Sequence, residues 1–218
     1  MNKDAVFQIL GKKKQQQLLA VLEEAWDQMS TPQRWEVFDG FINEARSDIP
    51  AIPEDTIKAV KQFQKDSLDG VYYAPFDINS KNFMDIPEET DAWFATLDEL
   101  FAECAKLTRQ KEYRVAVDGF DILYALIDRL GDDGIVFADE LGMWMFPGDM
   151  KDHNKAYIQA ASAICPLDEF KEKALSVIIE DHHSSCANKA YSVVKSIATP
   201  EQMALVDQAV QDRKLRTA

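Results

Sequence analysis

The sequence predicts an all-α protein, either an antiparallel helix bundle or a short right-handed helical-repeat array, with about nine helices. Three observations lead to this prediction. Prolines with acidic neighbours stand where helices could begin, apolar residues recur at spacings of three and four, and few runs alternate with period two. The first two features are typical of amphipathic helices, whereas half-buried strands would need alternation.

The N-terminal half is expected to form five helices. A short helix near 2–10 precedes one near 13–29, which begins at the solvated lysines 12–14. Helices near 32–46, 53–68 and 88–109 each begin at a proline. Their apolar residues recur at helical spacing, in the sets Leu18, Leu19, Leu22 and Trp26; Trp35, Phe38, Phe41 and Ile42; Ile57, Val60 and Phe63; and Trp93, Phe94, Leu97, Leu100 and Phe101.

The C-terminal half is expected to form helices near 112–130, 152–164, 167–182 and 185–214, the last broken at Thr199-Pro200. Thr199 and Gln202 have the spacing of a capping box, in which each side chain bonds the other residue's backbone N–H. The best strand candidate is the run 135–137 (Ile-Val-Phe), and one short strand does not make a sheet.

Length allows a single helical domain over 1–218, because single cores usually stop growing near ~250 residues. An N-terminal helical subdomain over 1–69 and a helical-repeat-like subdomain over 70–218 are the alternative. Two stretches, 70–86 and 131–150, are rich in aromatic, acidic and turn residues, which favours long irregular connections. Long connections in compact domains are often functional.

The formal net charge of −14 is concentrated in the middle of the chain. Residues 71–150 carry 17 acidic and 6 basic side chains, while residues 151–218 carry 9 of each. Such a balance disfavours nucleic acid, which needs a basic surface. No segment has the length and apolarity of a secretory signal or a membrane span, and the cysteines 104, 165 and 186 make no disulfide framework, so we expect a cytoplasmic protein.

Residues 97–127 resemble one unit of the tetratricopeptide repeat family. Leu100, Cys104 and Leu107 match its first helix, and the second helix is matched by Tyr113, Ala116, Phe120 and Leu123. Lys111 stands where the family's turn glycine is usual, and Asp128 stands where its closing proline is usual. A generic antiparallel helix pair explains the same residues. The resemblance implies a helical scaffold that binds a peptide or another protein, and it implies no catalysis.

The stretch 131–150 mixes acids with aromatic and methionine residues, a composition suited to docking a peptide. We expect partner-binding residues here, namely Asp132, Asp133, Asp139, Glu140, Trp144 and Phe146. The partner would be a protein or peptide, and a basic one would suit the acidic surface. The alternative interpretation is that these apolar residues plug the end of the helices.

Possible metal ligands are His182, His183 and Cys186, with His153 as a more distant candidate. Histidine and cysteine at spacings of three and four on one helix can bind zinc or another transition metal. The same residues also suit a helix C-terminus followed by a new helix, or a nucleophilic cysteine beside a base.

The run from Asp77 to Glu88 has oxygen ligands at four positions of a calcium loop, but Lys81 and Asn82 depart from that pattern. A solvated acidic loop over Phe76 and Phe83 fits these residues better.

The favoured function is therefore a non-enzymatic protein-interaction module or scaffold that uses an acidic, aromatic-rich face and needs no cofactor. Phosphate-loop, dinucleotide-binding, nucleophile-elbow and H-E-x-x-H motifs do not occur in the sequence. Two alternatives stay open. One is a metal-dependent enzyme built on the His/Cys/Asp cluster, and the other is an acidic immunity- or antitoxin-type inhibitor of a basic partner.

Overall fold

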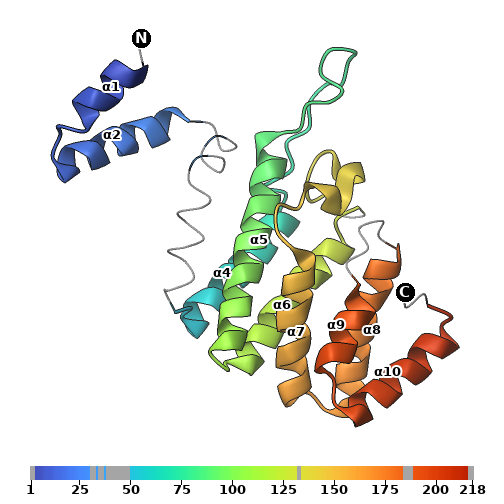
Figure 1. The fold of residues 1–218 in the computed structure, drawn as a ribbon. Helices are drawn as coiled ribbons and strands as arrows, with labels where there is room; N and C mark the ends of the chain where they lie inside the picture. Colours follow the sequence, from blue (N-terminus) through green and yellow to red (C-terminus); the bar gives the residue numbers. More distant parts are fainter. Residues whose placement is uncertain are drawn as a thin grey trace. The chain divides into compact units, whose positions relative to one another are not determined.

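A computed structural model describes residues 3–29, 33, 37, 50–131, 134–183 and 189–215 (Figure 1). These residues form nine α-helices and one 3-10 helix, and they contain no strand, so the all-α prediction is confirmed. None of the described helices is long and apolar enough to cross a membrane. The internal contacts divide the chain into two compact units, Met1–Ile49 and Pro50–Ala218.

The first unit contains α1 (Lys3–Leu10) and α2 (Gln15–Gln28), joined by a turn over residues 11–14. The backbone of Gly11 donates to the carbonyl of Phe7 at 2.9 Å, which ends α1. The helix expected near 32–46 lies outside the described residues, apart from residues 33 and 37.

The second unit begins with α4 (Pro53–Leu68) and ends with α10. Its remaining elements are α5 (Glu88–Arg109), α6 (Tyr113–Asp128), the 3-10 helix η1 (Asp139–Met145), α7 (Met150–Ile164), α8 (Leu167–His183), α9 (Ala190–Ile197) and α10 (Pro200–Asp212). Helix α4 packs against α5 and α6 and lies within this unit.

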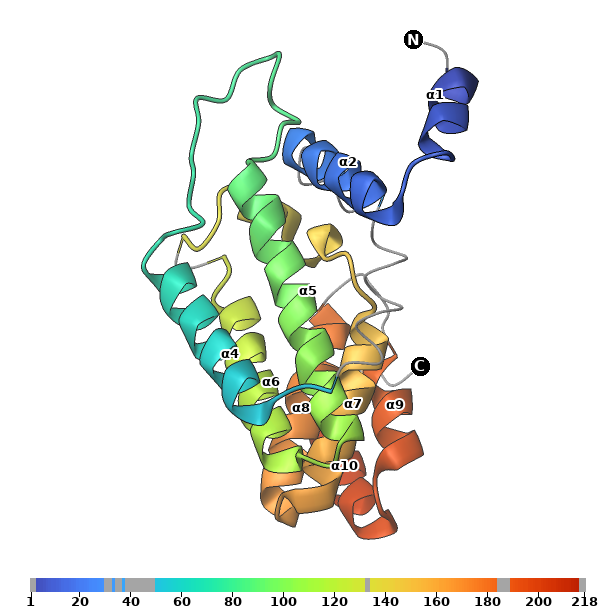
Figure 2. The ribbon, with the colours of Figure 1, turned by 90° about the vertical axis from the view of Figure 1, so that its left-hand side faces the viewer.

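Successive helices from α4 to α7 run in alternating directions (Figures 1 and 2). Helix α5 contacts α4, α6 and α7, and α7 also packs against α8 and α9. The alternation places the end of α4, the start of α5, the end of α6 and the start of α7 at one end of the unit. Because residues 69–87 and 129–149 connect these helix ends, both long connections lie at that end.

Helix starts follow the signals in the sequence. Pro53 opens α4 with Glu54 and Asp55 in its first turn, where acids complement the helix dipole. At α10 the capping box is confirmed: the Gln202 amide N–H donates to Thr199 Oγ1 at 3.2 Å, and the Thr199 N–H donates to Gln202 Oε1 at 2.9 Å. Gln202 Nε2 also donates to the Ser162 carbonyl at 3.1 Å, which ties α10 to α7.

The helix pair α5 and α6 packs closely because one residue at the contact has no side chain. A Cβ atom on Gly119 would lie 2.6 Å from the Cys104 sulfur, so only glycine fits there. The turn between the helices contains Lys111 at φ 69°, the left-handed conformation that glycine prefers. Its N–H donates to the Thr108 carbonyl, and the Glu112 N–H donates to the Leu107 carbonyl, which is a Schellman motif.

The core of the second unit is rich in fully buried aromatic side chains, namely Trp93, Phe94, Phe101, Phe120 and Phe170. The indole N–H of Trp93 donates to Ser67 Oγ at 2.8 Å, so its polar atom is satisfied. Ile135 and Val136 are also buried, but residues 135–137 form no strand. They pack as an irregular segment against the end of the helices.

Candidate functional site

The two long connections meet at one end of the second unit. The ring of Phe137 lies edge-on to Phe76 at 5.1 Å between centroids and to Tyr73 at 6.3 Å. Thr90, in the first turn of α5, donates its hydroxyl to the Phe137 carbonyl at 2.8 Å. The segments 73–85 and 131–140 are therefore joined by aromatic packing and anchored to α5.

A pocket of about 250 Å³ opens between these segments, and we call it the loop pocket. Its lining comes from both connections: Tyr73, Phe76, Ile78, Asn82, Phe83 and Asp85 from the first, and Gly131, Gly134, Val136, Phe137, Ala138, Asp139 and Glu140 from the second. The lining surface is thus about equally polar and apolar, with four aromatic side chains and three carboxylates.

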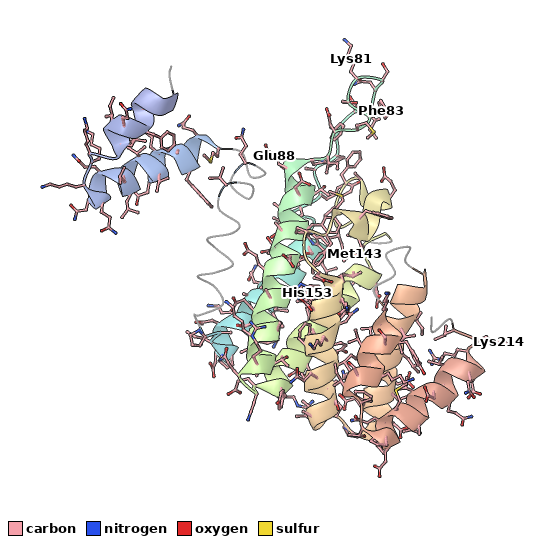
Figure 3. All side chains as sticks on the ribbon, in the orientation of Figure 1. Lys81, Phe83, Glu88, Met143, His153 and Lys214 are labelled. Atoms are coloured by element: carbon pink, nitrogen blue, oxygen red, sulfur yellow. The ribbon has the colours of Figure 1, made fainter. Side chains whose placement is uncertain are left out.

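Several large apolar side chains at this end are exposed to solvent. Phe83 is 66% exposed and Ile78 is 62% exposed, and both line the loop pocket. Met84 is 76% exposed and Trp144, in η1, is 74% exposed. Figure 3 shows Phe83 and Lys81 near the tip of the first connection, beyond the start of α5 at Glu88. The expectation that Phe83 packs beneath its loop is wrong, whereas Phe76 does pack on Phe137.

Carboxylates lie both in the lining of the loop pocket and in the first turn of α5. The first turn of this helix carries Glu88, Glu89 and Asp91. Partial burial raises the pKa of the Asp91 carboxyl, and the negative charge of Glu88 raises it further. Asp85, Asp139 and Glu140 add their charges within the lining.

The expected partner-binding residues fall into three groups. Asp139 and Glu140 line the loop pocket, and Trp144 is exposed on η1. Phe146 points inward instead, with its ring 6.0 Å from Phe101 and 5.7 Å from His153. The remaining two, Asp132 and Asp133, lie outside the described residues.

The aromatic contacts of Tyr73, Phe76 and Phe137 were not foreseen, although both stretches were expected to be irregular. The only signal in the sequence was that aromatic residues are dense in both stretches. Which of these aromatic residues meet depends on the alternating directions of the helices, and a local sequence pattern carries no information about those directions.

The run from Asp77 to Asn82 closes on itself through asparagine side chains. Asn79 Oδ1 accepts from the Lys81 N–H at 2.9 Å, and Asn82 Nδ2 donates to the Asp77 carbonyl at 2.9 Å. Asn82 Oδ1 also accepts from the Asn79 N–H at 2.6 Å. These oxygens are used to build turns, an arrangement typical of asparagine in loops rather than of a calcium site.

The expected metal ligands are not brought together in the described part of the chain. His153 lies inside the unit, where its Nε2 atom is 2.9 Å from Asp98 Oδ1 and its ring stacks on Phe101. Its Nδ1 atom is buried and has no hydrogen-bond partner among the described residues. Backbone atoms of His182 and His183 end α8, their side chains are not described, and Cys186 lies outside the described residues. No group of three or more His, Cys, Asp or Glu suited to a metal ion occurs among the residues that are described.

The two described cysteines are protonated at neutral pH. Burial raises the pKa of the Cys104 thiol to about 12. For Cys165, burial and a hydrogen bond from its Sγ to Glu169 Oε1 at 3.4 Å raise the pKa to about 11. A thiolate is the reactive form, so neither cysteine is activated as a nucleophile.

A chain of polar contacts links the helices α6, α7 and α8. Tyr157 donates its hydroxyl to Asp121 Oδ1 at 2.6 Å, and Lys173 Nζ lies 2.7 Å from Asp121 Oδ2. Burial raises the pKa of Tyr157, as does the Asp121 charge. Burial lowers the pKa of Lys173, but the hydrogen bond and charge of Asp121 outweigh this effect, so the net shift is upward. The arrangement fixes α7 and α8 against α6.

Comparison of the chain with protein-family models, curated proteins and solved structures gives no match.

Proposed function

We propose that this chain is a non-enzymatic protein-interaction module whose loop pocket binds a basic, partly apolar segment of another protein. The observation that carries the proposal is the meeting of residues 73–85 with residues 131–140 in one aromatic-lined pocket with three carboxylates. Interfaces are enriched in aromatic and methionine side chains that become buried on binding.

The size of the loop pocket supports a peptide side chain as its occupant. Its volume of about 250 Å³ lies below the ~300–1,000 Å³ typical of pockets that enclose whole small molecules or cofactors. A space of this size would admit one or two side chains of a bound segment, while the rest of that segment would stay outside the pocket.

Exposed apolar side chains of the two connections would supply affinity. Phe83, Met84 and Trp144 are 66%, 76% and 74% exposed. Contact with a partner would remove their apolar surface from water. Fully burying a side chain of the size of Phe or Met is worth about 1.5–3 kcal/mol relative to leaving it in water. Part of this gain would be offset by ordering the bound segment.

The charge of the site would select basic partners. Asp85, Asp139 and Glu140 lie in the lining, and Lys81 is the one basic residue in the described segments 71–91 and 134–149. Opposite charge accelerates association and excludes acidic competitors, and salt weakens both effects. An immunity-type inhibitor of a basic protein would use the same surface, so that alternative is a special case of this function.

The resemblance of residues 97–127 to a tetratricopeptide unit supports a scaffold role for α5 and α6. Cys104 and Gly119 hold these two helices in close contact, which makes a rigid pair. The first connection ends at the start of α5, and the second connection begins at the end of α6.

The experiment is selection of a displayed random peptide library on the full chain, with affinities of the enriched peptides measured by calorimetry. We expect enriched peptides to combine Lys or Arg with Leu or aromatic residues. Their affinity should fall about tenfold or more for the D139K/E140K variant, in line with two lost charge contacts. The F83A variant should also bind more weakly, because Phe83 lines the loop pocket and is exposed to a partner.

The matched control is Glu201→Lys with Asp212→Lys, which makes the same charge change at exposed positions of α10. It should leave binding unchanged. Enrichment of acidic peptides, or equal loss of affinity in the control, would contradict the proposal.

A further inference from the structure

Within the described part of the first unit, helices α1 and α2 leave large apolar side chains exposed. On α2, Leu19 is 51% exposed and Leu22 is 49% exposed; on α1, Phe7 is 63% exposed and Ile9 is 59% exposed. The two leucines are three residues apart and so lie on one side of α2. Helices of 8 and 14 residues are marginal by themselves in water, and most helical stability comes from packing an apolar face. A partner that covers these apolar residues would therefore stabilise the two helices.

Charge is distributed along α2 in a way that restricts the partner. Lys12, Lys13 and Lys14 are exposed just before the helix, and its first turn contains no acid to offset them. Glu23 and Glu24 are exposed in the second half of the helix. The order along the helix is thus basic start, apolar middle and acidic end.

A surface with this order is complementary to a second copy of itself in the antiparallel direction. The three lysines precede α2, and Glu23 lies eight residues after the first helical residue, Gln15, which is about 12 Å at 1.5 Å per residue. Leu19 and Leu22 lie between the two charged ends. When two copies cross near these leucines, the lysines of each copy approach the glutamates of the other. A parallel arrangement would bring like charges together, so the charge order selects the two-fold symmetric pair.

We propose that the chain forms a homodimer through its first unit, with the α2 helices of two copies packed antiparallel across Leu19 and Leu22. The contact is confined to α2, because Phe7 and Ile9 are two residues apart and face opposite sides of α1. The second copy covers the apolar residues, and the lysines at residues 12–14 of each copy pair with Glu23 and Glu24 of the other. This surface is separate from the loop pocket, so the dimer does not depend on the proposed peptide binding.

The first test is the molar mass of the full chain in solution, measured by sedimentation equilibrium over the micromolar range. The expected mass is twice the 24.7 kDa of the chain. The L19K/L22K variant should be monomeric over the same range. The L68K/V71K variant is the matched control, since it places the same two charges at exposed apolar residues of the second unit that lie outside the loop pocket, and it should leave the dimer intact.

The second test exchanges the charges, and it uses only exposed positions so that folding of the unit is not at risk. A K12E/K13E/K14E variant and an E23K/E24K variant should each dimerise at least about tenfold more weakly than the unchanged chain, or about 1.4 kcal/mol. Mixing the two variants should restore a mixed dimer, detected by capturing one tagged variant with the other. Far-UV circular dichroism of each variant verifies its helix content.

Several results would overturn the proposal. One is a monomeric unchanged chain, and another is a dimer that persists in the L19K/L22K variant. Failure of the mixed charge variants to associate would also contradict the antiparallel pairing. Flotation of a monomeric chain with phosphatidylserine vesicles, lost in the K12E/K13E/K14E variant, would assign this surface to lipid instead.

Discussion

His153 Nε2 lies 2.9 Å from Asp98 Oδ1, and this contact fastens the start of α7 to the middle of α5. The imidazole also stacks on Phe101, with 5.1 Å between ring centroids and 24° between planes. Gly148 covers the Asp98 carboxylate so closely that a Cβ atom would lie 1.9 Å from Oδ1. The segment that leads from η1 into α7 is therefore held by one contact between side chains, His153 with Asp98, and by one close approach of the backbone at Gly148.

The G148A variant should lower the free energy of unfolding by about 1–3 kcal/mol, the usual cost of forcing extra atoms into a packed site. The added methyl group must displace either the Asp98 carboxylate or the backbone. Urea denaturation followed by circular dichroism measures the change. Gly131→Ala is the control, because its Cβ would meet nothing within 4 Å, and equal stability of the two variants would contradict the predicted contact.

The K111G variant should be more stable than the unchanged chain by about 1 kcal/mol. Lys111 holds the left-handed conformation at φ 69°, which strains any residue with a Cβ atom. The K111A variant keeps the Cβ and should bring no gain. Thermal unfolding of the three proteins provides the comparison, and a gain in K111A as large as in K111G would point to the lysine charge rather than the backbone.

Replacing Thr199 by Ala should lower stability by about 1 kcal/mol, because the helix α10 loses its N-cap acceptor. The T199S variant keeps the hydroxyl and should retain most of the stability. Chemical denaturation measures both. If Ser and Ala destabilise equally, the methyl group of Thr199 rather than its hydroxyl is what matters.

Stability should fall at alkaline pH because of Cys104. Burial raises the pKa of this thiol from 9.0 to about 12 on folding. Its contribution is therefore complete below pH 9.0, where the thiol is protonated in both states, and is lost as the pH rises toward about 12. The expected slope in that window is about 1.4 kcal/mol per pH unit from this one group.

Urea denaturation at several pH values separates this effect from other titrations. The C104A variant lacks the thiol, so its stability should fall less steeply than that of the unchanged chain. Parallel pH profiles for the two proteins would show that the Cys104 thiol titrates alike in the folded and unfolded states.

The helices were predictable because their signals are local. Pro53 with Glu54 and Asp55 fixes the start of α4, and the Thr199 and Gln202 pair fixes the start of α10. The 3-10 helix η1 was not predicted. It contains Gly142 at φ 51° and follows Ala138 at φ 66°, and these left-handed positions interrupt any regular apolar period.

The composition of the candidate site was predictable, but its assembly was not. Asp139 and Glu140 were expected from the acidic stretch that contains them, and they do line the loop pocket. Phe146 had the same local signature as Trp144, yet it packs inward on Phe101 and His153. The difference comes from the His153–Asp98 contact, which joins residues 55 positions apart and leaves no trace in a short window of sequence.

The two walls of the loop pocket stand on either side of the α5–α6 hairpin in the chain, and this order has a consequence for folding. Helices with local contacts form early, whereas contacts between distant segments wait until the intervening chain is compact. Phe76 cannot meet Phe137 until α5 and α6 have paired and returned the chain to its starting end. The pocket should therefore be among the last parts of the unit to form, and a partially folded chain would display the exposed aromatic residues without the geometry that selects a partner.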